Sequence, residues 1–349
     1  MQSILSFNYL SEVRLKNIYV TMKRLYLATF LALTMWCASA NAQSYIQNTM
    51  FMYNRVAFNP AAVGAGSQPQ LTLLGRYQWV GLDGAPRLFT LSGDGKIDAI
   101  RGGLGGYVIG DRLGPLSTIG ANVAYAFHLE LGDGGEDSNA PTLQIGVQAG
   151  VLQKAINGTF VYSEQIFGPD PVIPSGDYTA SAIVPSLGAG VYLNGPDQKY
   201  YVGISAHDLL EPSLEGLLQT DVGEVSNVPR TFYIMGGYRF DFNNDKLHLQ
   251  PNFMARTDGA SFQFDIGANM TIDPIVIGLS HRWQDSFSGL VGFTISDRLF
   301  LAYSYDYTLS DLNANRDLHS HELVLSYRFS TGTKIPTQQL NVKDKFGKD

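Results

Sequence analysis

Apolar and polar residues alternate with a period of two along long stretches of this chain. From Thr118 to Leu131 the apolar side chains fall on one face of an extended strand and the polar ones on the other. The same alternation recurs at 143–151 and at 262–270. Each run is about as long as the 9 to 11 residues of a tilted membrane strand, and longer than most strands of globular proteins. The pattern predicts strands with lipid on one side and a polar lumen on the other.

About fourteen such segments are predicted, and together they indicate an all-β fold, a transmembrane antiparallel β-barrel over residues 70–329. Their expected ranges are 70–80, 87–95, 102–110, 117–131, 141–154, 184–194, 199–207, 229–242, 246–256, 261–272, 275–283, 287–296, 299–308 and 318–329.

The lengths of the connections predict the orientation of the barrel. Long connections, at 155–183, 208–228 and 309–317, follow odd-numbered segments. Tight turns, at 243–245, 273–274 and 297–298, follow even-numbered ones, whereas the connection at 132–140 is longer than this rule predicts. Outer-membrane barrels have short periplasmic turns and long extracellular loops, so we expect both ends of the barrel in the periplasm. Aromatic residues at the segment ends, such as Trp79 and Phe329, are typical of membrane-interface belts.

A secretory leader precedes the barrel. Lys23 and Arg24 follow Met22, an apolar run occupies 25–38, and small residues end at Ala42 before Gln43. This pattern predicts a signal peptide over 22–42 with cleavage between Ala42 and Gln43, and it leaves residues 1–21 as a start-site extension. The apolar run is shorter than the roughly 20 residues of a membrane-spanning helix. Cys37 raises the alternative of a lipoprotein, which the bulky Trp36 before it disfavours.

The segment at 43–69 differs from the rest of the chain. Ile46, Met50, Tyr53 and Ala57 recur at helical spacing, and Asn59-Pro60 is expected to stop the helix. A barrel of this width leaves a lumen that its own side chains do not fill. We therefore expect a short helical segment in or near the lumen as a partial plug, with a periplasmic tether as the alternative. The polar residues 330–349 are expected to form a periplasmic tail.

Composition excludes some functions. A net charge of −7 at pH 7 gives no support for a nucleic-acid partner, whose phosphates call for basic patches. Ser280 and His281 are neighbours on a strand and point to opposite faces, so they cannot form a nucleophile and base pair. His319 and His321 share a face, but without a further ligand nearby they favour an interfacial pair over a metal site. We expect no enzyme activity, no metal and no cofactor.

Four stretches carry a family resemblance. They are Asn59-Pro60-Ala61, the block Arg-Tyr-Gln-Trp-Val-Gly-Leu-Asp-Gly-Ala-Pro at 76–86, Asp-Arg-Leu-Gly-Pro-Leu at 111–116, and His-Glu-Leu-Val-Leu-Ser-Tyr-Arg-Phe at 321–329. From about residue 45 to 330 the chain resembles the PorP/SprF family, outer-membrane proteins of the type IX secretion system. The candidate partner-docking or motif residues are Asn59, Pro60, Gln78, Trp79, Gly81, Asp83, Gly84, Pro86, Asp111, Gly114 and Pro115.

The resemblance implies an outer-membrane component that assists secretion or surface anchoring of partner proteins, including gliding adhesins, with no chemistry of its own. It implies contacts with outer-membrane lipid, with an adhesin or other cargo, and with periplasmic ring components of the machinery. The residues themselves leave open whether the turn at 81–86 docks a partner or only closes a hairpin. An alternative class is a channel for hydrophobic small molecules, similar to the long-chain fatty acid porins, which have an Asn-Pro-Ala motif and a longer N-terminal hatch.

Overall fold

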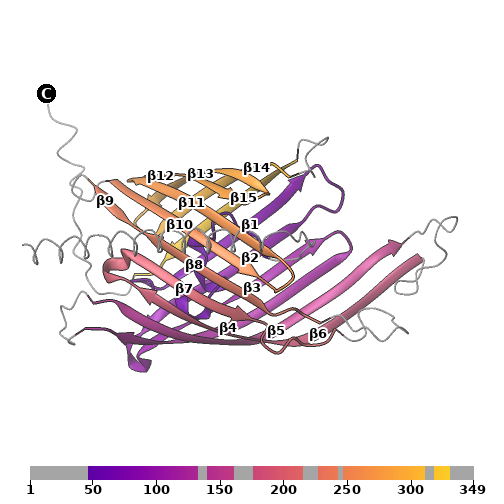
Figure 1. The fold of residues 1–349 in the computed structure, drawn as a ribbon, viewed down its shortest axis with the longest axis horizontal. Helices are drawn as coiled ribbons and strands as arrows, with labels where there is room; N and C mark the ends of the chain where they lie inside the picture. Colours follow the sequence, from indigo (N-terminus) through magenta and orange to yellow (C-terminus); the bar gives the residue numbers. More distant parts are fainter. Residues whose placement is uncertain are drawn as a thin grey trace, which may run out of the picture. The chain divides into compact units, whose positions relative to one another are not determined.

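The strands form one closed antiparallel barrel (Figure 1). The computed structural model describes residues 46–132, 140–160, 176–214, 227–242, 247–310 and 318–330. The strands are β1 (Gln70–Val80), β2 (Arg87–Ile97), β3 (Gly102–Leu113), β4 (Leu116–Glu130), β5 (Thr142–Phe160), β6 (Gly176–Asn194), β7 (Tyr200–His207), β8 (Thr231–Tyr238), β9 (Phe240–Phe242), β10 (Leu247–Thr257), β11 (Phe262–Ile272), β12 (Ile275–Arg282), β13 (Ser286–Ser296), β14 (Leu299–Thr308) and β15 (His319–Arg328).

Two pairings close the sheet on itself. β1 pairs with β15, and β10 pairs with β11. Because β8 and β9 both pair with β10, they are two parts of one strand interrupted at Arg239, and the barrel has 14 strands. The predicted all-β barrel is confirmed. We call the end where β1 begins and β15 ends the terminal end, and the opposite end the loop end.

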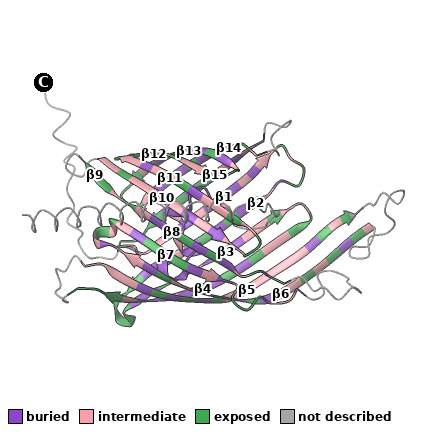
Figure 2. Cartoon of the chain, viewed as in Figure 1, coloured by how far each residue is buried: buried purple, intermediate pink, exposed green. Residues whose placement is uncertain are grey.

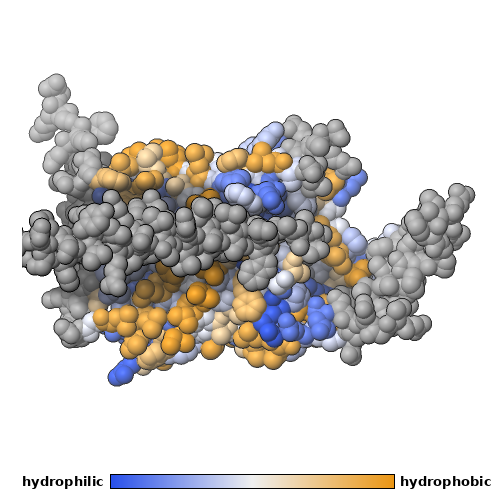
Figure 3. Space-filling model, viewed as in Figure 1, coloured by the Kyte–Doolittle hydropathy of each residue, from blue (hydrophilic) through white to orange (hydrophobic). Residues whose placement is uncertain are grey.

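The two faces of the strands differ as the alternation predicts (Figure 2). Val123 on β4 is 71% exposed, whereas its neighbour Asn122 is 7% exposed and points inward. Leu279 on β12 and Val291 on β13 are likewise exposed and apolar. Apolar residues gather on the outer surface of the strands in Figure 3. In a bilayer this surface meets lipid, and the antiparallel ladders pair the backbone polar groups of neighbouring strands. No helix among the described residues is long and apolar enough to cross a membrane.

The β5–β6 hairpin corrects the predicted boundaries of 141–154 and 184–194. Both strands have 19 residues and are paired to their ends, from Thr142 with Asn194 to Phe160 with Gly176. At a rise of about 3.3 Å per residue they exceed the membrane span by far. They extend beyond their neighbours in Figure 1. Their outer parts pack in a small apolar cluster of Ile156, Tyr178, Val184, Leu214 and Val228. The strand ends that extend past the lipid need no apolar outer face, so the alternation of apolar and polar residues that identifies membrane strands is weaker there.

The turns at the terminal end are short where the structure describes them, as predicted, whereas the long connections of the loop end lie largely outside the described residues and the turn at 114–115 of that end is short as well. At the terminal end β11 and β12 are separated only by residues 273–274, and β13 and β14 only by 297–298. Short 3-10 turns, η4 (Asp98–Ile100) and η5 (Pro196–Gln198), make two further turns of this end. Residues 259–262 belong to a separate small unit and form a bend with Gly259 at a φ of +88°. The turn at 243–245, most of 132–140, the leader with Ala42 and Gln43, and the tail beyond 330 lie outside the described residues.

Residues 46–66, called the plug here, occupy the lumen. They form three 3-10 turns, η1 (Phe51–Tyr53), η2 (Arg55–Ala57) and η3 (Pro60–Ala62), rather than one helix. Met50, Phe58 and Val63 are fully buried and belong to the main apolar cluster. An amphipathic helix buries one apolar face. The barrel wall surrounds the plug, so side chains of the plug are buried on several sides. The expected position is confirmed, and the expected single helix is wrong.

Candidate functional site

One end of the plug is held by a buried ionic cluster on three adjacent strands. The Glu322 carboxylate on β15 accepts hydrogen bonds from the backbone N–H groups of Thr49 (2.9 Å) and Met50 (2.8 Å). The Thr49 hydroxyl donates to Asp306 on β14 (2.7 Å). Arg76 on β1 pairs with Asp306 (2.7 Å) and with Glu322 (2.9 Å). All three charged side chains are at most 2% exposed, so each depends on its partners for compensation.

The cluster connects the two longest stretches of the family resemblance. Arg76 opens the block at 76–86, and Glu322 lies in the closing block at 321–329. The register of β1 against β15 places these two residues opposite each other. Gln78, the next inward residue of β1, donates a hydrogen bond from its side chain to Gln47 at the start of the plug (3.1 Å). Inward residues of the motifs therefore bind the plug.

The other end of the plug is fixed at Asn59. Its side-chain oxygen accepts from the N–H of Ala61 (2.9 Å), and its amide donates to the carbonyl oxygen of Val191 on β6 (3.1 Å). The helical turn η2 ends at Ala57, just before the predicted stop at Asn59-Pro60, and Asn59 is extended and caps a new turn that begins at Pro60. Gly190 makes the close approach feasible, because a Cβ atom there would lie 2.2 Å from the Asn59 side-chain oxygen.

Further wall residues bind the plug between these two ends. The Phe58 carbonyl oxygen accepts from Ser205 (2.5 Å) and from His207 (2.9 Å), both on β7. Asp94 on β2 accepts from the N–H of Gly64 (2.8 Å). Arg55 donates to the hydroxyl of Tyr192 (2.7 Å) and lies over the ring of Tyr201, 4.9 Å from its centroid.

These contacts give hydrogen-bond partners to backbone and side-chain polar groups of the plug that are buried in the lumen. Beside them, burial raises the pKa of the Tyr53 hydroxyl, an effect that Arg328 partly opposes.

The turn at the loop end of β1 has the compact form that its sequence predicts. Gly81 and Gly84 have φ values of +100° and +73°, and the N–H of Gln78 donates to the carbonyl oxygen of Pro86 (3.0 Å). Trp79 lies at a bulge of β1 and donates its N–H to the hydroxyl of Ser320 (3.1 Å). Asp83 is exposed at the tip. The turn is a closed hairpin connection with a charged tip.

The two predicted motif turns meet at the loop end. The N–H of Gly114 donates to the carbonyl oxygen of Gly84 (2.8 Å), and a Cβ atom on Gly84 would come 3.0 Å from the Cα atom of Gly114. Pro115 completes the second turn, while Asp111 lies within β3. The structure thus joins the turns at 81–86 and 114–115, but it places Asn59 and Pro60 in the lumen against β6. The candidate residues form two sites rather than one.

The outer face of β14 and β15 carries the two histidines considered for a metal. The Tyr303 hydroxyl and Nδ1 of His321 are 2.6 Å apart, and the ring of His319 packs against those of Tyr305 and Tyr307. This arrangement is typical of an interfacial aromatic belt. No group of three or more potential metal ligands is present among the described residues.

Sequence reasoning missed the most strongly bound residues of the lumen. Arg76, Asp306 and Glu322 are charged residues at inward positions of predicted strands, and this signal was available. Their convergence depends on the closure of β1 against β15, which the alternation alone does not give.

The fold and the plug define a class: this is an outer-membrane-type β-barrel whose lumen contains its own N-terminal segment. The model of the family described as type IX secretion system membrane protein PorP/SprF matches residues 40–327. The chain belongs to the PorP/SprF family, and its barrel fold and family support a location in the outer membrane.

Solved structures of outer-membrane proteins resemble the chain only distantly. Omp33 of Acinetobacter baumannii has 10% identity and a TM-score of 0.42, and the match covers 75% of this chain and 98% of that one. The toluene transporter TodX of Pseudomonas putida has 11% identity and a TM-score of 0.45, with coverages of 83% and 95%. The monoaromatic hydrocarbon channel CymD has 10% identity and a TM-score of 0.42, with coverages of 83% and 95%. No curated protein matches the chain.

Proposed function

We propose that this barrel assists the secretion or surface anchoring of partner proteins, such as gliding adhesins, as an outer-membrane component of the type IX secretion system. The family match over residues 40–327 carries the proposal. The plug contacts support it. Arg76 and Glu322 belong to the stretches that carry the family resemblance, and they bind the plug at the junction of the first and last strands, which is more than the closing of a hairpin requires. Export through the signal peptide at 22–42 and the absence of enzyme activity are parts of the same proposal.

The joined motif turns are the proposed docking surface for the cargo. They lie at the loop end, which the asymmetry of connection lengths assigns to the cell exterior. The hydrogen bond between Gly114 and Gly84 fixes the two turns to each other, and Asp83 and Arg87 offer exposed charges beside them. A rigid, exposed turn can bind a partner at little cost in conformational entropy.

The alternative, transport of a hydrophobic small molecule, has less support. Such a route needs an apolar path through the barrel. The plug occupies the lumen, where it packs in the main apolar cluster and is bound by polar and ionic contacts, and a wide cavity at the terminal end is lined largely by polar and charged side chains. We therefore favour secretion.

Deletion of the gene tests the function. We expect a specific adhesin or set of secreted proteins to be lost from the cell surface and retained or degraded inside, measured by surface biotinylation and mass spectrometry. Uptake of labelled fatty acid should be unchanged. Normal surface display in the deletion strain would overturn the secretion proposal, and reduced fatty acid uptake would support the alternative.

A charge reversal tests the docking surface. Asp83→Lys with Arg87→Glu should reduce surface display of the cargo while the barrel stays folded, because complementary charges set partner specificity. The matched control reverses the charges of an exposed ion pair of the same end, Glu211→Arg with Arg230→Glu (3.1 Å in the native chain). Equal display in the two double variants would show that the motif turns are not the docking site.

A further inference from the structure

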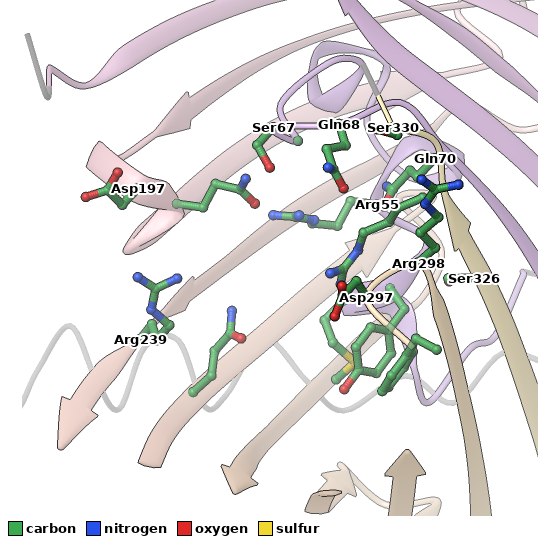
Figure 4. A pocket seen from close by; sticks show the side chains of 17 residues that line it. Arg55, Ser67, Gln68, Gln70, Asp197, Arg239, Asp297, Arg298, Ser326 and Ser330 are labelled. Carbon is green, nitrogen blue, oxygen red and sulfur yellow. The ribbon is translucent and has the colours of Figure 1, made fainter. Parts of the chain in front are cut away.

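A cavity of about 960 Å³ opens at the terminal end of the barrel (Figure 4). Its walls come from the plug, the residues before β1, the turns at 196–198 and 297–298, the β8–β10 region and the end of β15. Its volume lies at the upper end of the roughly 300–1,000 Å³ of ligand pockets. We call it the vestibule. Because the short turns of this end predict that it lies in the periplasm, we expect the vestibule to face that compartment.

The vestibule is basic, although the chain as a whole carries a charge of −7. Four of its lining residues are arginines, and its lining carboxylates are those of two aspartates; these are Arg55, Arg239, Arg298, Arg328, Asp197 and Asp297. Arg239 is paired with Asp241 (2.8 Å). Among the described residues, Arg298 and Arg328 make no ion pair within 4.0 Å.

Arg55 is one of these four arginines. It donates to the neutral hydroxyl of Tyr192, so its positive charge is not matched by a directly bonded carboxylate. The lining of the vestibule therefore favours an anionic ligand.

We propose that the vestibule binds an acidic peptide segment of a periplasmic partner in the secretion machinery, an inference that rests on the proposed function. Guanidinium groups bind carboxylates through paired, charge-assisted hydrogen bonds. The four arginines come from four separate elements, and Figure 4 shows Arg239 well separated from Arg298. Several carboxylates along an extended peptide suit this spacing better than one phosphate does. Gln68, Gln70 and Ser67 add donors and acceptors for the peptide backbone.

A segment bound in the vestibule would also touch the plug. Met52, Tyr53 and Arg55 line the vestibule and lie within or between the first two turns of the plug. Arg55 is in turn bound to wall residues of β6 and β7 through Tyr192 and Tyr201. The partner therefore binds the plug and the barrel wall together from the periplasmic side.

Binding of a fluorescein-labelled hexaglutamate peptide to the purified full chain in detergent micelles tests this proposal. We expect saturable binding by fluorescence anisotropy that weakens as salt rises. Arg298→Glu with Arg328→Glu should weaken it by about tenfold or more. Arg101→Glu is the matched control, an exposed arginine at the same end that does not line the vestibule. Heat-modifiability on a gel verifies that each variant is folded.

Equal affinity of the double variant and the control would overturn the proposal, as would the absence of saturable binding to the native chain. Competition by phosphatidylglycerol micelles as strong as by unlabelled hexaglutamate would assign the site to lipid headgroups and also overturn it. The assay uses purified protein and does not measure secretion. Its failure is thus separate from that of the proposed function, which the gene deletion tests.

Discussion

Arg76 binds both residues of the barrel wall and a residue of the plug. Its guanidinium bonds Glu322 and the Thr49 hydroxyl (3.0 Å) through one nitrogen and Asp306 through another. The two acids bind the plug directly, through the backbone of Thr49 and Met50 and the hydroxyl of Thr49. Removing Arg76 would leave two buried carboxylates close together with reduced compensation.

Arg76→Ala should therefore destabilise the folded barrel by about 3–5 kcal/mol. The measurement is the midpoint of urea unfolding in detergent, followed by tryptophan fluorescence. Arg87→Ala is the control: that arginine is exposed and lies over the ring of Tyr77 (4.7 Å), an interaction worth about 0.5–1 kcal/mol. A midpoint for Arg76→Ala no lower than that of the control would mean that the cluster does not stabilise the fold.

At the scale of elements, the sequence predicts the strand segments that face lipid and misses the segments that do not. Alternation locates β4 or β11 because lipid demands an apolar outer face. It misses the ends of β5 and β6 at residues 155–160 and 176–183, which extend beyond the lipid and need no apolar outer face. The plug shows the second limit. Helical spacing of Ile46, Met50 and Tyr53 suggested a helix, but hydrogen bonds from the wall satisfy its backbone in short 3-10 turns.

The ends of the elements also predict the orientation of the barrel. Asp83 lies in the β1–β2 turn at the loop end and Asp98 in the β2–β3 turn at the terminal end, and both are exposed. Cys37, the one cysteine of the sequence, lies in the predicted signal peptide. Asp83→Cys should react with a membrane-impermeant maleimide on intact cells. Asp98→Cys should react only after lysis. The opposite pattern would invert the assignment of both ends.

For the whole molecule, we expect the plug to make the barrel a closed body rather than a pore. Its main apolar cluster includes plug residues such as Phe51 and Phe58 and wall residues such as Met235 and Met254. Ion passage would require displacement of the plug from this cluster and from its hydrogen bonds.

Conductance in planar bilayers tests the closed state. The full chain should conduct little, and a variant lacking residues 46–66 should open a steady pore, because a 14-stranded wall leaves a lumen that its side chains do not fill. Heat-modifiability must first show that the shortened barrel is folded. Equal conductance of the two proteins would mean that the plug does not seal the lumen.

The position of Arg76 and Glu322 on facing strands also bears on how the barrel is made. These strands, β1 and β15, come from opposite ends of the barrel sequence, and their pairing is the last one that synthesis permits. Thr49 and Met50 bind Glu322, while Arg76 bridges the same junction. Without the plug, Glu322 would lose its hydrogen bonds from Thr49 and Met50, and Asp306 its hydrogen bond from Thr49, while Arg76 would still pair with both carboxylates. The plug and the first and last strands therefore stabilise one seam together, so we expect a barrel that has closed around its plug to reopen less readily than an empty one.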